Sequence, residues 1–249
     1  EVEALIQHDA ISRALGKVNR PLRFAQGATV PERLRAMYPK PQNPASNQPV
    51  SAPPSEDLTE ELEGHILKEL GQLPSMAGAG ADGSYFEHLQ LHTKIAGGAE
   101  SLAKVLAQLV TGKAPPEVVQ WFRSGRSHPL LKEDSEVDIR PLTAPTSAWR
   151  CTLRGWARMF KEEVIHATGN TQFGCGQPGG ATELRHSLEA ALLANPTKAL
   201  LSIDIKNMHG SLEVDNTERQ VLNNTPRLWP LLAPWIRSPR VHIYRDDTG

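Results

Sequence analysis

Residues 200–212 read LLSIDIKNMHGSL, and this stretch decides the fold more than any other. It opens with a short apolar run that ends in Asp204, which is typical of a buried strand at 199–204. A strand that ends in a carboxylate is a common way to hold a metal ion, because the sheet fixes the side chain while its oxygens face an open cleft. The alternative role for Asp204 is that of an ordinary turn or helix N-cap residue.

Amphipathic helices are predicted on the N-terminal side of this strand. Ser55 and the acidic residues after it form an N-cap and first turn, and Gly71 ends the helix. Its apolar residues recur every fourth position: Leu58, Leu62, Ile66 and Leu70. A second helix carries an apolar face of Leu102, Val105, Leu106, Leu109 and Val110. A further helix is expected at 182–194, directly before the strand.

A helix predicted at 147–166 carries a row of basic residues. The spacings of Arg150, Arg154, Arg158 and Lys161 place all four on one helix face. One interpretation is a solvated face, with Trp149, Trp156 and Phe160 in the core. The other is a row that contacts nucleic-acid phosphates.

Composition limits the possible classes of protein. The chain has 249 residues. Its six prolines within 39–54 predict a linker there. Its net charge of -1 excludes a uniformly basic protein that coats nucleic acid. Two cysteines, Cys151 and Cys175, cannot form a disulfide framework, so we expect an intracellular protein with no disulfide-linked partner. No apolar run is long enough to span a bilayer, and we expect no membrane partner.

Five segments, in order, resemble conserved blocks of reverse transcriptases from non-LTR retrotransposons. They are GAGADGSYFEHL (78–89), GKAPPEVVQWFRSGRSHPLLK (112–132), DIRPLT (138–143), QFGCGQPGGA (172–181) and LLSIDIKNMHGSL (200–212). The resemblance spans 78–212. It implies an α+β chain with helical fingers and an incomplete antiparallel palm sheet, in the right-hand polymerase arrangement.

The resemblance also implies roles for single residues. Asp204 is the catalytic residue and ligates the metal, together with the backbone carbonyl of Ile205. Lys132 and Arg140 bind dNTP phosphates, although surface hairpin charges are the alternative interpretation. His209 stands where the family carries an aromatic residue that blocks a ribose 2'-hydroxyl. The cofactor of the complete enzyme is Mg²⁺, or Mn²⁺ in its place.

The last seven residues contain a second candidate motif. Residues 244–247 read YRDD and match the box that supplies the other carboxylates in this family. We interpret them instead as a turn after a strand at 241–244, because they follow Asp204 too closely and no Gln-Gly segment lies between. On this interpretation the second catalytic carboxylates are absent from the chain.

The sequence therefore predicts three parts. Residues 1–54 form a disordered basic arm and proline-rich linker, 55–197 the fingers-like helices and hairpin, and 198–249 a truncated palm with its helix at about 214–224. The implied function is nucleotidyl transfer from dNTPs to a DNA primer on an RNA template, in which Arg150, Arg154, Arg158 and Lys161 hold the nucleic acid. We expect the isolated chain to be inactive. The alternatives are a non-catalytic nucleic-acid-binding or assembly module, or a decayed retroelement remnant.

Overall fold

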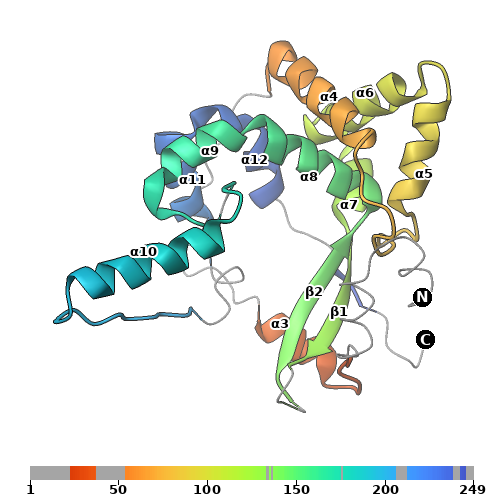
Figure 1. Ribbon diagram of the computed structural model, residues 1–249. Coiled ribbons are helices and arrows are strands. Elements are labelled where there is room, and N and C mark those ends of the chain that lie inside the picture. The colour runs from red at the N-terminus through yellow and green to blue at the C-terminus, as the bar shows by residue number, and fades with distance from the viewer. Residues whose placement is uncertain are drawn as a thin grey trace.

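The structure, a computed structural model, describes residues 23–37, 54–132, 135, 137–174, 176–205, 212–237 and 242–244. It has an α+β architecture: a body of packed helices from which a long β-hairpin projects (Figure 1). The α-helices are α3 (Val30–Ala36), α4 (Glu56–Leu70), α5 (Phe86–Gln90), α6 (Gly98–Val110), α7 (Pro116–Arg123), α8 (Ser147–Met159), α9 (Lys161–Thr168), α10 (Gly180–Ala194), α11 (Val214–Asn224) and α12 (Trp229–Ile236). Short 3₁₀ turns lie at Leu91–Lys94, Gly169–Thr171 and Pro226–Leu228. The strands are β1 (Gly125–Leu131), β2 (Ile139–Pro145) and β3 (His242–Ile243).

The core of the helical body lies where α4, α6 and α8 meet. The predicted apolar face of α4 is confirmed, since Leu58, Leu62, Ile66 and Leu70 are all buried. The predicted face of α6 is confirmed at Leu106 and Val110, which are buried, and at Leu102 and Leu109, which pack against the core, whereas Val105 is 52% exposed. The helix also buries Ala103 and Ala107, which a pattern built only on large apolar residues does not include.

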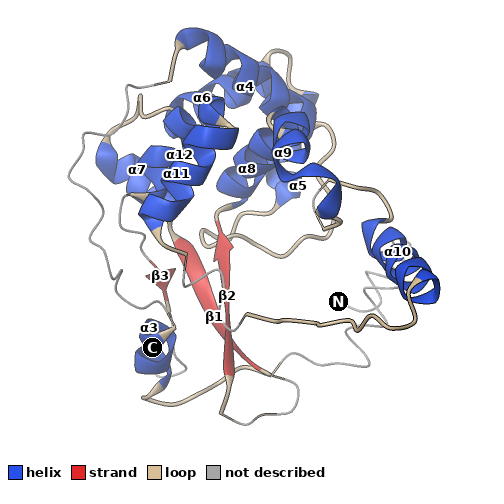
Figure 2. Cartoon of the chain, turned by 90° about the vertical axis from the view of Figure 1, so that its left-hand side faces the viewer, coloured by secondary structure: helices blue, strands red, loops and turns tan. Residues whose placement is uncertain are grey.

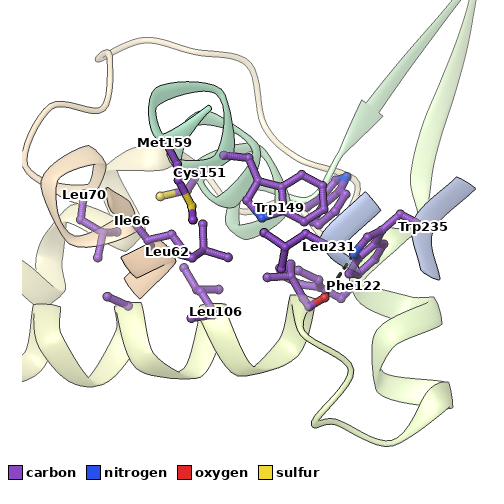
Figure 3. Close-up of a cluster of buried hydrophobic side chains, with 14 of the residues drawn as sticks. Leu62, Ile66, Leu70, Leu106, Phe122, Trp149, Cys151, Met159, Leu231 and Trp235 are labelled. Atoms are coloured by element: carbon purple, nitrogen blue, oxygen red, sulfur yellow. Dashed lines mark hydrogen bonds between the residues drawn. The ribbon is translucent and has the colours of Figure 1, made fainter. Parts of the chain in front are cut away.

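Aromatic side chains complete this core (Figure 3). The ring centroids of Trp149 and Trp235 are 4.2 Å apart, and those of Trp149 and Phe122 are 5.5 Å apart. Trp156 also lies in the cluster. The interpretation that places the aromatics of α8 in the core is therefore confirmed.

Helix α12 was not predicted, and it contributes Leu231 and Trp235 to the same core. Pro230 lies in its first turn, where the missing N–H costs nothing. The predicted domain boundary at 197/198 therefore divides one hydrophobic core. Helix α11 has the predicted bounds.

The predicted helix at 147–166 is two helices. Phe160 has φ −99° and ψ 7°, outside the helical region, and it separates α8 from α9. Its ring is 2% exposed. Burial of this ring accompanies the break, and Lys161 consequently belongs to α9 rather than to the arginine helix.

Strands β1 and β2 form an antiparallel hairpin within the predicted α+β chain. Strand β3 pairs with β1 in parallel at Gly125 and Arg126, giving the strand order β2-β1-β3. The strand predicted at 241–244 is thus present in part. The residues of the second candidate motif after Tyr244 lie outside the described residues.

Residues 23–37 are packed against this hairpin, where the sequence predicted a disordered arm. Phe24 bridges to Leu130, and the Ala25 N–H donates to the Pro129 carbonyl at 2.8 Å. Helix α3 buries Val30 and Leu34 against Ile139 of β2. A few apolar residues between basic ones are enough to pack this segment against the hairpin. The overall composition of the segment does not predict that packing.

The strand predicted at 199–204 is the main error of the fold prediction. The structure describes this segment as extended and exposed, without a strand partner in the described part of the chain. It follows α10, which projects away from the helical body (Figure 2). The apolar run therefore forms no buried strand of a sheet here.

Candidate nucleic-acid interface

The two faces of the β1–β2 hairpin differ in burial and charge. Side chains alternate between the faces of a strand, and cross-strand partners share a face. The positions on one face are mostly buried, among them Gly125, Ser127, Pro129 and Ile139. The other face, here called the basic face, carries Arg126, His128, Leu130, Lys132, Asp138, Arg140 and Leu142, and its three cations and Asp138 are all exposed. The basic face therefore exposes three positive charges and one negative charge to solvent.

Lys132 and Arg140 lie on this basic face as diagonal neighbours. The Lys132 N–H donates to the Asp138 carbonyl at 2.9 Å, which continues the ladder one step beyond Leu131 and Ile139. Diagonal residues on one sheet face lie about 7–8 Å apart, within reach of long side chains. The hairpin thus brings together the two cations that the sequence predicted for triphosphate binding.

Arg23 holds the end of the hairpin in place. Its guanidinium donates to the carbonyls of Lys132, at 3.2 Å, and Ser135, at 3.1 Å. The Leu131 N–H in turn donates to the Arg23 carbonyl at 2.8 Å. The backbone that carries Lys132 is therefore fixed by the N-terminal segment, which sequence analysis gave no role.

An exposed aromatic ring lies beside the basic face. Phe24 is 47% exposed, and its ring centroid is 6.0 Å from that of His128. Partial burial and the nearby Arg126 lower the pKa of His128 below its ordinary value. His128 is therefore held neutral at neutral pH, between a ring and a cation.

We expect the His128 pKa to appear in the pH dependence of stability. Because folding lowers this pKa, the unfolded chain binds more protons, and stability falls as the pH drops below about 6.5 through the folded-state pKa. His128→Gln should lose less stability than the wild type between about pH 7.5 and about pH 5.5 in urea titrations. His166→Gln, at an exposed position on α9, is the matched control. An identical pH response in wild type and His128→Gln would contradict this prediction.

The predicted arginine row on α8 is engaged within the protein. Arg154 Nε donates to Glu69 Oε2 at 2.7 Å, and Arg158 Nε donates to Glu69 Oε1 at 2.5 Å. The Glu69 side chain is only 3% exposed, whereas the two arginine side chains are 44% and 38% exposed. Arg158 also donates to Gln72 at 2.7 Å. One buried carboxylate thus orders both cations, while part of each guanidinium still faces solvent.

Arg150 and Lys161 lie apart from this pair. Arg150 donates to the Gly78 carbonyl at 2.7 Å, and its guanidinium lies 4.5 Å from the Phe86 ring centroid. Burial lowers the pKa of Arg150 from its ordinary value. Lys161 is exposed at the start of α9. The structure therefore divides the four predicted nucleic-acid-binding residues between two helices.

Asp204 and Ile205 lie in the exposed extended segment, and His209 lies outside the described residues. A two-metal site needs several oxygen ligands. In the described part of the chain, no group of three or more His, Cys, Asp or Glu side chains could hold a metal ion. Among these residues, Asp204 therefore stands without the further ligands that a complete two-metal site would need.

Sequence reasoning missed Phe24, Arg126 and Glu69. The register of β1 and β2 is what places Arg126 with Arg140, and a two-residue period along 125–131 was the available signal. Glu69 falls within the apolar face of α4, and it contacts two arginines 85 and 89 residues further along the chain. No local pattern predicts a contact at that separation.

Comparison with known proteins gives no relative: no family model, no curated protein and no solved structure matches this chain. Among the described residues, no helix has the length and apolar character needed to cross a membrane.

Proposed function

We propose that this chain is the fingers and the first part of the palm of an RNA-directed DNA polymerase of the non-LTR retrotransposon type. The observation that carries the proposal is the basic face of the β1–β2 hairpin, with Lys132 and Arg140 as exposed diagonal neighbours. Arginine can hold a phosphate through two hydrogen bonds and lysine acts as a point charge, so the pair suits a triphosphate. In this proposal the face binds a dNTP and the RNA template with its DNA primer.

The catalytic part of the proposal belongs to the complete enzyme. Asp204 and the Ile205 carbonyl are its proposed metal ligands, and Mg²⁺ would supply charge stabilisation for in-line phosphoryl transfer. Among the described residues, Asp204 belongs to no group of three or more potential metal ligands. We therefore expect the chain by itself to bind nucleic acid without extending a primer.

A second candidate, a non-catalytic nucleic-acid-binding module, is favoured by the other end of the basic face. The exposed Phe24 ring lies 6.0 Å from the His128 ring, and Arg126 is two residues from His128 on the same strand face. Cations beside an exposed ring are the usual components of a single-strand binding surface, because the phosphates pair with the cations and a base stacks on the ring. This candidate requires no metal and no second carboxylate.

Fluorescence anisotropy with a labelled primed RNA template tests the interface shared by both candidates. The double variant Arg126→Ala/Arg140→Ala should bind at least about tenfold more weakly, and the slope of log affinity against log salt should fall by about 0.7–0.9 per lost phosphate contact. Lys104→Ala/Arg219→Ala removes two exposed cations from α6 and α11 and serves as the matched control. An equal loss of RNA affinity in both double variants would contradict the proposed interface.

Primer extension on the same template tests whether this chain has polymerase activity, and dNTP binding separates the two candidates. Templated incorporation that Asp204→Ala abolishes would assign polymerase activity to this chain and overturn our expectation that it is inactive alone. Binding without incorporation fits the non-catalytic module as well as a partial polymerase. Loss of dNTP-dependent stabilisation of the complex in Lys132→Ala then favours the polymerase.

A further inference from the structure

His128 lies on the basic face between two arginines. Arg126 is two residues away on the same face of β1, and Leu142 is the cross-strand partner of His128 on β2. Arg140, two residues before Leu142, is therefore a diagonal neighbour of His128, and such neighbours lie about 7–8 Å apart. Both arginines are exposed, so the half-buried imidazole ring has a solvent-facing cation on each side.

The imidazole ring is positioned by an aromatic neighbour. Its centroid lies 6.0 Å from that of Phe24, with 54° between the two ring planes. Phe24 is bridged to Leu130, so the N-terminal segment is joined to the strand that carries His128. Within the described residues, neither nitrogen of the ring makes a hydrogen bond, and neither is buried. Both nitrogens are therefore open to a ligand.

The charged groups around His128 are mostly cations. Those on the basic face and in the N-terminal segment beside it are Arg23, Arg126, Lys132, Asp138 and Arg140. Asp138 lies two rows further along the face, opposite Lys132, and Arg23 directs its guanidinium to backbone carbonyls at the hairpin end. On β3, Ile243 lies on this face, and α3 packs on the opposite one. No carboxylate in the described part of the chain contacts His128.

A bound phosphate would give the protonated ring an anionic partner. Burial of the ring and the nearby Arg126 lower the pKa of His128 below its ordinary value of 6.5, so the ring is neutral in the free protein at neutral pH. An opposite charge within about 4–6 Å favours the charged form of a titratable group. When a complex binds more protons than its free partners, its formation becomes more favourable as the pH falls.

We propose that His128 is a phosphate-binding residue of the basic face, which takes up a proton from solvent when a nucleic-acid backbone binds between Arg126 and Arg140. The phosphate then meets three cations in place of two, and nucleic-acid affinity rises as the pH falls. This inference rests on the proposed function of the face. It adds a binding residue and a pH dependence that neither candidate function includes.

Fluorescence anisotropy with the primed RNA template, labelled with a dye that does not titrate in the range used, tests the proton uptake. Between about pH 8 and about pH 5.5, the affinity of the wild type should rise at least about fivefold more than that of His128→Gln. His128→Lys carries a fixed charge, so at about pH 8 it should bind more tightly than the wild type, with a salt slope steeper by about 0.7–0.9. His166→Gln, at an exposed position on α9, is the matched control and should keep the wild-type pH dependence.

Circular dichroism at each pH checks that the variants are folded, and His128→Lys keeps the test decisive if His128→Gln does not fold. An equal rise of affinity in the wild type and His128→Gln overturns the proposal and leaves the proposed function intact. So does an equal loss of affinity in His128→Gln at both pH values, since the ring then acts as a neutral contact. At about pH 8, a His128→Lys variant that binds no more tightly than the wild type also overturns it. If Arg126→Ala/Arg140→Ala binds as tightly as the wild type, the proposed function of the face fails, and this inference fails with it.

Discussion

Trp235→Ala is expected to lower the free energy of unfolding by about 3–5 kcal/mol. The Trp235 side chain is 2% exposed and stacks near Trp149, with 4.2 Å between ring centroids. Its Nε1 donates to the Val110 carbonyl at 3.2 Å, and Arg123 lies 4.5 Å from its ring centroid. Alanine would leave a large cavity and remove the partner of a buried carbonyl. Urea denaturation followed by circular dichroism measures the loss.

Trp121→Ala is the matched control for this experiment. Trp121 lies on α7 and is 60% exposed, so the same substitution should change the free energy of unfolding by no more than about 0.5 kcal/mol. A loss at Trp235 no larger than the loss at Trp121 would show that α12 is not part of the core. A loss of the expected size shows that residues assigned by sequence to the palm stabilise the predicted fingers.

The comparison of sequence with structure shows which patterns are informative. The bounds of α11 and the buried face of α4 follow from local periodicity. In a helix that packs on one side, the buried residues recur three and four positions apart in the sequence. Trp229 and Trp235 gave no such signal, because α12 contains two prolines and is short. Its formation depends on burial against distant helices, which is a tertiary effect.

In the candidate site, too, some features could be predicted from the sequence and others depend on contacts between distant segments. Lys132 and Arg140 were assigned to a hairpin through the family resemblance, and the structure places both at the β1–β2 hairpin. The contribution of residues 23–37 could not be predicted, since it rests on one bridge from Phe24 to Leu130 and one small cluster around Ile139. At 199–204 the predicted buried strand is wrong, since the segment forms no strand and its apolar residues are exposed. Burial depends on a partner strand, and the local sequence does not specify one.

Glu69→Ala is expected to lower the free energy of unfolding by about 2–3 kcal/mol. The Glu69 carboxylate contacts both Arg154 and Arg158, at 2.7 and 2.5 Å, and it joins α4 to α8. Removing one partner of a buried ion pair typically costs about 3–5 kcal/mol, and the cost here is smaller because both guanidiniums are partly exposed and can regain water. Glu60→Ala, at an exposed position on the same helix, controls for helix propensity and should change stability by no more than about 0.5 kcal/mol.

The same variant also tests the role of the arginine row. If the exposed parts of Arg154 and Arg158 contact phosphates, removing Glu69 takes away a competing carboxylate and should tighten binding of a labelled RNA in anisotropy titrations. If the row only joins α4 to α8, stability falls and RNA affinity stays equal to that of Glu60→Ala. Titrations are made well below the unfolding midpoint, so that the two readouts remain independent. A stability loss below about 0.5 kcal/mol would contradict the buried-pair argument, because an ordered carboxylate that is 3% exposed should not be removable without cost.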